Sequence, residues 1–193
     1  DRIALEREIL NQKRKDILRE VEEKRKYQDE IEMKLKMLTK ESKGNYNQEK
    51  ENTEKIYNLL KKEIENYEEA LREPYFGRVD FSEKFGNEEN IYIGKKGISS
   101  SVDGEEIVVD WRAPVADLYY SGTGGEAYYR APMGVIEGEL NLKRKFLYNN
   151  NDLEKIFDES TNKIIINDAE GSELVDEFLK INLEESRGKK LKE

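Results

Sequence analysis

The sequence predicts an α+β fold: a long antiparallel coiled-coil hairpin over residues 1–73, an antiparallel β-meander or barrel-like subdomain over residues 74–170, and a C-terminal helix over residues 171–193. Two observations lead to this prediction. Apolar residues recur at multiples of seven through the first segment, and after Pro74 the apolar pattern changes to alternation. The chain has 40% charged and 36% hydrophobic residues, which indicates a small core and much solvated helix surface.

The first segment carries the narrow apolar seam of a coiled coil rather than a broad apolar face. Only Lys24 interrupts its row, which consists of Ile3, Leu10, Ile17, Ile31 and Leu38, with Val21 and Leu35 at partner positions. In the second segment the apolar residues step by three or four, through Ile56, Leu60, Ile64, Tyr67 and Leu71. Gly44 is suited to end the first helix, and Asn45 with Gln48 resembles a capping box for the second. At a rise of ~1.5 Å per residue, the first helix would reach roughly 60 Å.

Strands are expected between turn signals after Pro74. The expected segments are residues 75–81, 91–98, 106–111, 117–120, 127–129, 134–148 and 153–157, with 164–166 as a candidate for one more. Asp103-Gly104 is a strong hairpin signal between two of them. Ser172 is the expected N-cap of the final helix, whose apolar side would consist of Leu174, Val175, Phe178 and Leu179.

The composition excludes several kinds of site. The chain has no cysteine and no histidine, so it has no disulfide, no thiolate or imidazole metal ligand and no cysteine nucleophile. No apolar run approaches the ~20 residues of a membrane span, so no membrane partner is expected. Residues 1–73 have a net charge of −1 and residues 74–193 one of −8. The second part is therefore unsuited to hold a nucleic-acid backbone by itself.

No catalytic or cofactor site is expected in this chain. Residues 122–125 are rich in glycine, but no helix is expected after them, so they are interpreted as a tight turn rather than a phosphate loop. Residues 94–97 lack the phosphate-loop spacing as well. Asp110 and Arg112 share one side of a strand and Trp111 lies on the other. They form either a salt bridge beside a buried indole or a contact surface, because Trp and Arg are enriched at interface hot spots.

The far end of the hairpin is the natural contact site, because the end of a long arm has little packing to do. The candidate partner-binding residues are Lys40, Glu41, Lys43 and Tyr46 at this end, together with Trp111 and Arg112.

Four separated stretches resemble the N-terminal region of HelD-type proteins, which are superfamily 1 helicase-like ATPases related to UvrD and Rep. The stretches are residues 74–81, 91–94, 109–115 and 138–144, in this order. The hairpin is similar only in kind, as a coiled coil in the same place.

The resemblance implies that the hairpin inserts into the secondary channel of bacterial RNA polymerase, where the parent ATPase helps to remodel or recycle transcription complexes. It implies a cytoplasmic protein, and it places ATP, Mg²⁺ and nucleic-acid binding in downstream parts of the parent. The tip offers a single acid, Glu41, between Lys40 and Lys43. Docking or steric obstruction is therefore expected, rather than direct action on the polymerase active-site metal.

Two alternatives remain open. The chain could be the accessory domain of a DNA helicase that acts without polymerase. It could also be a periplasmic adaptor of the membrane-fusion type, which joins a helical hairpin to a small β barrel. The second alternative is disfavoured, because all the strand-like sequence follows the hairpin, whereas an adaptor barrel is completed from both sides of it.

Overall fold

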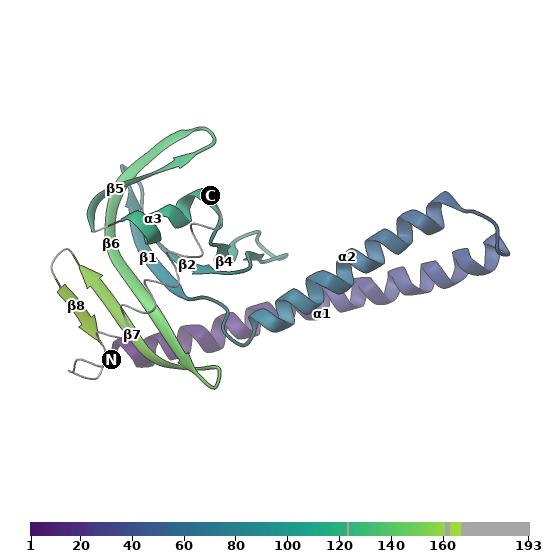
Figure 1. Ribbon diagram of the computed structural model, residues 1–193, viewed down its shortest axis with the longest axis horizontal. Helices are drawn as coiled ribbons and strands as arrows, with labels where there is room; N and C mark the ends of the chain where they lie inside the picture. Colours follow the sequence, from purple (N-terminus) through teal and green to yellow (C-terminus); the bar gives the residue numbers. More distant parts are fainter. Residues whose placement is uncertain (123, 161–162, 167–193) are drawn as a thin grey trace.

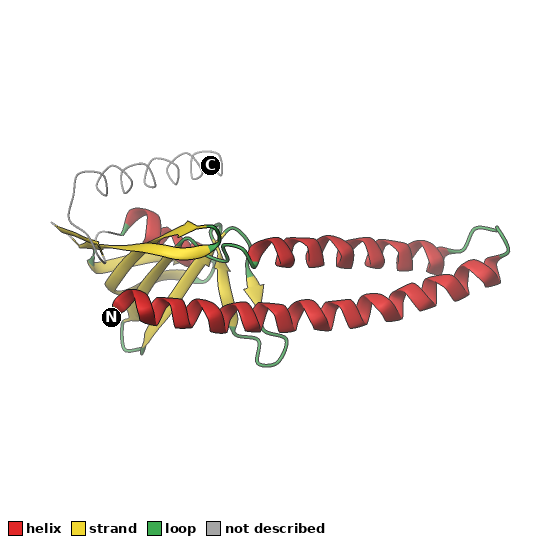
Figure 2. Ribbon diagram, turned by 90° about the horizontal axis from the view of Figure 1, so that it is seen from below, coloured by secondary structure: helices red, strands yellow, loops and turns green. Residues whose placement is uncertain are grey.

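The computed structural model describes residues 1–122, 124–160 and 163–166, and it confirms the predicted α+β class. Two antiparallel helices, α1 (Arg2–Ser42) and α2 (Gln48–Ala70), project from a twisted sheet (Figure 1). Viewed from below, α1 first runs along the sheet and then continues outward beside α2 (Figure 2). The molecule is therefore elongated, with the strands at one end and the helix–helix turn at the other.

Local backbone chemistry sets the ends of both helices. The Asp1 side chain caps α1 by accepting from the backbone N–H of Ile3 at 3.2 Å. Lys43 (φ 52°) and Gly44 (φ 83°) both adopt the left-handed conformation that ends α1. The predicted cap at Asn45 was wrong by two residues, because the reversal leaves Asn45 in the loop. Asn47 caps α2 instead, accepting from the Lys50 N–H at 3.1 Å.

In the described residues, eight strands form one sheet in the order β3-β4-β2-β1-β6-β7-β8, with β5 paired to β6. Their bounds are β1 Gly77–Glu83, β2 Glu88–Gly94, β3 Ile98–Ser99, β4 Glu106–Asp110, β5 Gly125–Ala131, β6 Gly134–Asn149, β7 Asp152–Ser160 and β8 Lys163–Ile166. Strand β6 is long enough to pair with β5, β1 and β7 in turn along its length.

The sheet is mixed and open, so the prediction of an antiparallel, barrel-like meander needs correction. Strands β2 and β4 pair in parallel, through Ile93↔Val109 and Gly94↔Asp110. The expected single strand over residues 91–98 breaks into β2 and β3, with Gly94 and Gly97 at the break. The hairpin around Asp103-Gly104 then returns β4 beside β2 in the same direction. The described strands do not close into a barrel.

Residues 117–120 belong to a short helix rather than the predicted strand. Pro114 opens a 3-10 turn, η1 (Pro114–Ala116), where its missing N–H costs nothing, and α3 (Asp117–Ser121) continues from it. Leu118 and Tyr119 of α3 are buried against the sheet. The glycines that follow, Gly124 (φ 95°) and Gly125 (φ 75°), turn the chain into β5. The predicted C-terminal helix over 171–193 lies outside the described residues.

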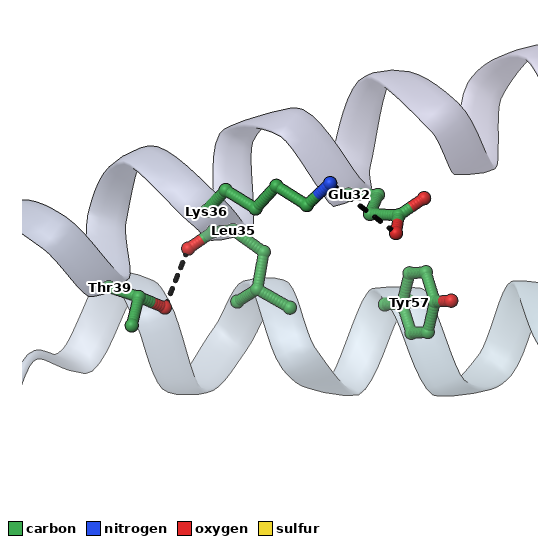
Figure 3. A pocket seen from close by; sticks show the side chains of 5 residues that line it. All are labelled: Glu32, Leu35, Lys36, Thr39 and Tyr57. Carbon is green, nitrogen blue, oxygen red and sulfur yellow. Dashed lines mark hydrogen bonds and ion pairs between the residues drawn. The ribbon is translucent and has the colours of Figure 1, made fainter.

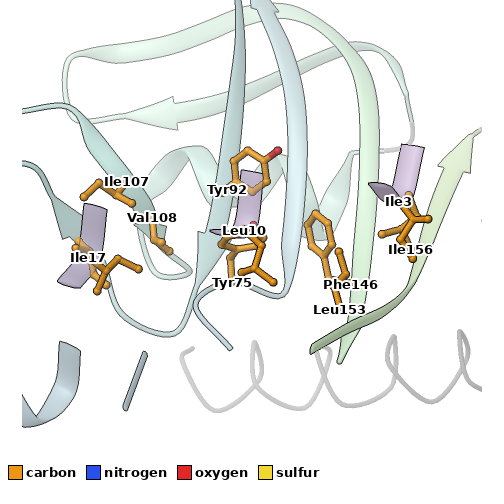
Figure 4. Packing of buried hydrophobic residues seen from close by; sticks show 11 residues of the cluster. Ile3, Leu10, Ile17, Tyr75, Tyr92, Ile107, Val108, Phe146, Leu153 and Ile156 are labelled. Atoms are coloured by element: carbon orange, nitrogen blue, oxygen red, sulfur yellow. The ribbon is translucent and has the colours of Figure 1, made fainter. Parts of the chain in front are cut away.

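Helices cover the sheet on both faces. On one face, η1 and α3 pack over a cluster that includes Val79, Phe81, Ile93 and Leu140. On the other face lies the first half of α1, whose contacts are drawn in Figure 4. The cluster on this face combines Ile3, Leu10 and Ile17 of α1 with Tyr75, Tyr92, Ile98, Ile107, Val108, Phe146, Leu153 and Ile156.

The predicted seam therefore has two different partners. Its first three members, Ile3, Leu10 and Ile17, pack on strands rather than on α2. Its later members, Ile31 and Leu38, are buried where α1 and α2 run together, as are Leu60 and Ile64 of α2. We call the helix pair beyond the sheet, residues 22–66, the arm, and the remainder of the described chain the base.

Candidate interaction surfaces on the arm and its base

A buried charge cluster holds the first turns of α1 to the sheet. Arg78 of β1 donates to Glu6 Oε1 at 2.7 Å, and the Tyr92 hydroxyl donates to the same oxygen at 2.8 Å. The Glu6 side chain is fully buried. Arg78 also makes a two-pronged pair with Asp80, at 2.8 and 3.0 Å. Because a buried carboxylate is stable only with charged or hydrogen-bonded partners, Glu6 fixes the position of α1 on the strands.

A second arginine extends this cluster toward β7. Arg144 lies 3.6 Å from Glu6 and makes two hydrogen bonds to Asp158, at 2.6 and 2.9 Å. Arg2, in the first turn of α1, pairs with the same Asp158. Burial works against the charged form of Arg78, but the hydrogen bonds that it donates to Asp80 and the charge of Glu6 raise its pKa. Burial, with the Glu6 carboxylate nearby, raises the pKa of Tyr92. Both groups therefore keep their usual protonation at neutral pH.

Sequence reasoning missed these residues, although signals for them were present. Glu6 lies three residues after Ile3 and four before Leu10, so it is a charge on an apolar helix side. Arg78 and Arg144 each lie within a motif that carries the HelD resemblance, yet neither was assigned a role.

Basic side chains of α1 fasten the helix further along the base. Lys13 donates to the carbonyl of Ile107 at 2.7 Å, and Arg14 donates to those of Leu71 and Arg72 at 2.8 and 2.6 Å. Burial lowers the pKa of Lys13. Where the arm leaves the base, the Glu20 carboxylate accepts from the N–H and hydroxyl of Ser101, at 2.9 and 3.1 Å. Contacts thus run from Arg2 to Glu20 and bind α1 to the base over about five helical turns.

Ion pairs between the helices accompany the short apolar seam of the arm. Lys24 pairs with Glu63 at 2.8 Å, and Arg25 pairs with Glu68 at 2.5 Å. Nearer the tip, Lys34 pairs with Glu49 at 3.3 Å. Because these groups are largely exposed, each pair contributes little to stability. Their positions nonetheless favour one register of α2 along α1.

All four predicted tip residues lie at the far end of the arm, as expected. Lys40 is in the last turn of α1, and Glu41 and Lys43 follow it, all exposed. Tyr46 is 76% exposed in the loop, and its hydroxyl bonds to the side chains of Gln48 and, at 2.9 Å, Glu51. The aromatic ring is therefore held in place while its face stays open to a partner.

Trp111 and Arg112 lie on the base, so the structure does not bring them together with the tip. Arg112 is exposed and pairs with Asp110 through two hydrogen bonds, at 3.0 and 2.8 Å. These bonds lower the pKa of Asp110. The Trp111 ring is half-buried against the cluster under η1 and α3, and its backbone N–H donates to the Gly94 carbonyl at 2.9 Å. The salt bridge beside a partly buried indole is thus present.

A shallow cleft opens between the arm helices near the tip (Figure 3). It has a volume of about 420 Å³ and is lined by Glu32, Leu35, Lys36, Thr39 and Tyr57. Lys36 is tied to Glu32 at 3.8 Å, and Thr39 bonds to the Leu35 carbonyl within its own helix. The cleft therefore presents mainly Leu35 and Tyr57, which is a surface suited to protein contact rather than to catalysis.

No group of three or more acidic side chains in the described residues could hold a metal ion. None of the helices in the described part of the chain is both long and apolar enough to cross a bilayer.

The stretches that carry the HelD resemblance meet in the middle of the sheet. The N–H of Phe76 donates to the Ile93 carbonyl at 2.9 Å, and Gly94 pairs with Asp110 across the parallel strands. The N–H of Phe146, just after the fourth stretch, donates to the Phe76 carbonyl at 3.0 Å. These residues thus form the structural centre of the base.

Comparison with known proteins identifies the family. No curated protein matches the chain. The family model described as the N-terminal domain of DNA helicase IV HelD matches residues 3–173, which include both arm helices and every described strand. The chain therefore belongs to the family of HelD N-terminal domains.

Proposed function

We propose that this chain is the polymerase-docking region of a helicase-like ATPase, and that its arm enters the secondary channel of bacterial RNA polymerase. The observation that carries the proposal is the single helix α1, which is fastened to the base through Glu6 and Glu20 and extends without a break to an exposed tip. Membership of a helicase-related family supports the ATPase parent.

The shape and charge of the arm are suited to docking in a channel rather than to catalysis. Two paired helices present a cross-section of about 10 by 20 Å, which is narrow enough for a channel. The tip combines Lys40 and Lys43 with a held aromatic ring at Tyr46 and a single acid at Glu41. In this proposal the tip obstructs the secondary channel or anchors the protein in it. ATP, Mg²⁺ and nucleic acid bind to other parts of a cytoplasmic parent protein.

A pull-down with purified bacterial RNA polymerase tests the proposal. The intact chain is expected to retain polymerase, and a variant with residues 30–58 replaced by a Gly-Asn-Gly turn is expected to lose it. The base of this variant should stay folded, because the contacts of Ile3, Leu10 and Ile17 are untouched. The triple variant Lys40→Glu, Lys43→Glu, Tyr46→Ser, which keeps the arm, should also lose retention. Equal retention by all three proteins would rule out the arm as the docking element.

The same experiment addresses the alternatives. A DNA helicase accessory domain that works without polymerase would show no retention by any variant, together with salt-dependent DNA binding by the parent. The membrane-fusion adaptor gains no support from an open sheet or from the family match.

A further inference from the structure

The sheet face that α1 crosses continues beyond the helix into a region that none of the described residues covers. Arg78, Asp80 and Ser82 alternate along one side of β1, and Arg78 bonds to Glu6 of α1. Ser82 pairs with Glu88 of β2 and with Glu139 of β6, and Glu139 pairs with Glu126 of β5. One row of side chains thus crosses four strands on this side. We call this region the open face; it consists of Ser82, Glu88, Glu126, Tyr128, Arg130, Val135, Glu137 and Glu139, in which Arg130 lies opposite Val135.

Four carboxylates of the open face stand against one base, Arg130, and in the described part of the chain no ion pair joins Arg130 to any of them. Glu126 and Glu139 stand directly opposite each other, an arrangement that is destabilising for like charges. Glu88 accepts a hydrogen bond from Asn141 at 2.9 Å, which leaves its charge in place. Within the described residues, no ion pair reaches Glu126, Glu137 or Glu139. A cation placed over this row would relieve the repulsion.

Exposed apolar groups adjoin these carboxylates. Tyr128 pairs with Glu137 across β5 and β6, and it is 58% exposed. Val135 is 51% exposed on the same side, and Met133 in the β5–β6 turn is fully exposed. In Figure 1 this hairpin forms the top of the base and is separate from the arm helices. An apolar patch edged by charge is typical of a protein-contact surface.

The charge of the open face limits the kind of partner that it can bind. Its negative charge repels nucleic-acid phosphates, and it equally repels a second copy of itself. We propose that the open face docks a basic polypeptide segment of another protein, whose lysine or arginine side chains lie among Glu126, Glu137 and Glu139 while an apolar side chain packs on Tyr128 and Val135. This site is separate from the arm tip and does not depend on polymerase binding.

Fluorescence anisotropy of a labelled peptide on the 193-residue chain tests this assignment. The probe is the heptapeptide Lys-Leu-Lys-Val-Lys-Leu-Lys, and its matched control has glutamate in place of every lysine. The basic peptide is expected to bind and the acidic one is not. The double variant Glu137→Gln, Glu139→Gln should weaken binding about fivefold, because it removes two exposed ion pairs. Tyr128→Ser should weaken it with no change in net charge.

A matched control separates a docking surface from a net-charge effect. The double variant Glu54→Gln, Glu65→Gln makes the same charge change on exposed positions of the arm, and it should bind the basic peptide like the unmodified chain. Equal weakening in both double variants would overturn the proposal. Binding of the basic peptide only after residues 187–193 are removed would also overturn the proposal. This segment is itself basic, and it would then be the segment that the open face binds. Tighter binding of a labelled single-stranded oligonucleotide than of the peptide would also overturn it.

Discussion

At the scale of single residues, Glu6 shows how a charge on an apolar helix side can be stable. It is fully buried, yet Arg78 and Tyr92 both donate to its Oε1, and Arg144 lies nearby. Such a cluster contributes less to net stability than its many contacts suggest, because every charge had to leave water. Its removal is nonetheless costly, since the remaining partners stay buried.

Glu6→Gln is therefore expected to lower the free energy of unfolding by about 3 kcal/mol, as found when one partner of a buried pair is removed. Urea denaturation measures this change. Glu8→Gln, an exposed position in the same helix turn, is the control and should change stability by less than about 0.5 kcal/mol. Equal effects would show that Glu6 does not hold α1 in place.

Asp110 gives a prediction about pH. Hydrogen bonds from Arg112 lower its folded pKa, so the pair stabilises the fold above the unfolded value of about 3.9 and loses this contribution as the pH falls through the lower folded pKa. In Arg112→Gln, the Asp110 pKa measured by NMR titration should rise toward its ordinary value. The two proteins should differ in stability near neutral pH and become alike in strong acid. An unchanged Asp110 pKa would contradict this.

Gly94, within one of the motifs, has a packing reason to be glycine. A Cβ at this position would overlap the Pro74 carbonyl and lie 2.8 Å from Val108 Cγ1. Because a backbone atom cannot move aside cheaply, Gly94→Ala should destabilise the base by about 1–3 kcal/mol in thermal or urea unfolding. In Gly86→Ala the nearest atom would be 3.4 Å away, so this control should be close to neutral.

At the scale of elements, α1 is one helix with two kinds of partner. Ile17 packs on the sheet, whereas Ile31, on the same seven-residue row, is buried in the arm. Ile17→Ala should lower global stability by about 2–5 kcal/mol. Ile31→Ala should instead speed hydrogen exchange in the arm and leave protection of the strands unchanged. Faster exchange throughout the sheet in Ile31→Ala would show that arm and base unfold as one unit.

The sequence was sufficient to predict the helices and most strands, because their periods of about seven and two are direct consequences of helix and strand geometry. The sequence did not show that the two halves of α1 pack on different elements, because an apolar row spaced by seven can pack on either a helix or a sheet. The neighbouring positions held the distinction. Four residues after a row member, Arg7 and Arg14 in the first half donate to backbone carbonyls of the base, whereas Leu35 at the same position in the arm is apolar.

Tertiary contacts explain the remaining errors. The short helix α3 looked like a strand because its tyrosines favour sheets, but Pro114 starts a helical turn and Tyr119 is buried under it. The parallel pairing of β2 with β4 depends on how the chain turns between Gly94 and Gly97, which no periodicity reports. Of the candidate contact residues, the tip group was placed correctly, but their binding role stays a prediction.

At the scale of the whole molecule, the arm and the open face lie on different parts of the chain, so their roles are separable. Replacing residues 30–58 should abolish polymerase retention while the basic peptide still binds, and Glu137→Gln with Glu139→Gln should weaken peptide binding about fivefold while polymerase is still retained. Pull-down and anisotropy on the same two proteins check this. Joint loss in either variant would mean that the two surfaces serve one binding event.

The unbroken course of α1 from Arg2 to Ser42 also has a mechanical consequence. A stiff rod clamped at one end amplifies any rotation of its clamp. A tilt of the sheet by about 5° would swing the loop between the helices through roughly 3 Å, because about 33 Å of α1 extends beyond its contact with the base at Glu20. Small rearrangements beneath the helix thus become displacements as large as a side chain at its remote end.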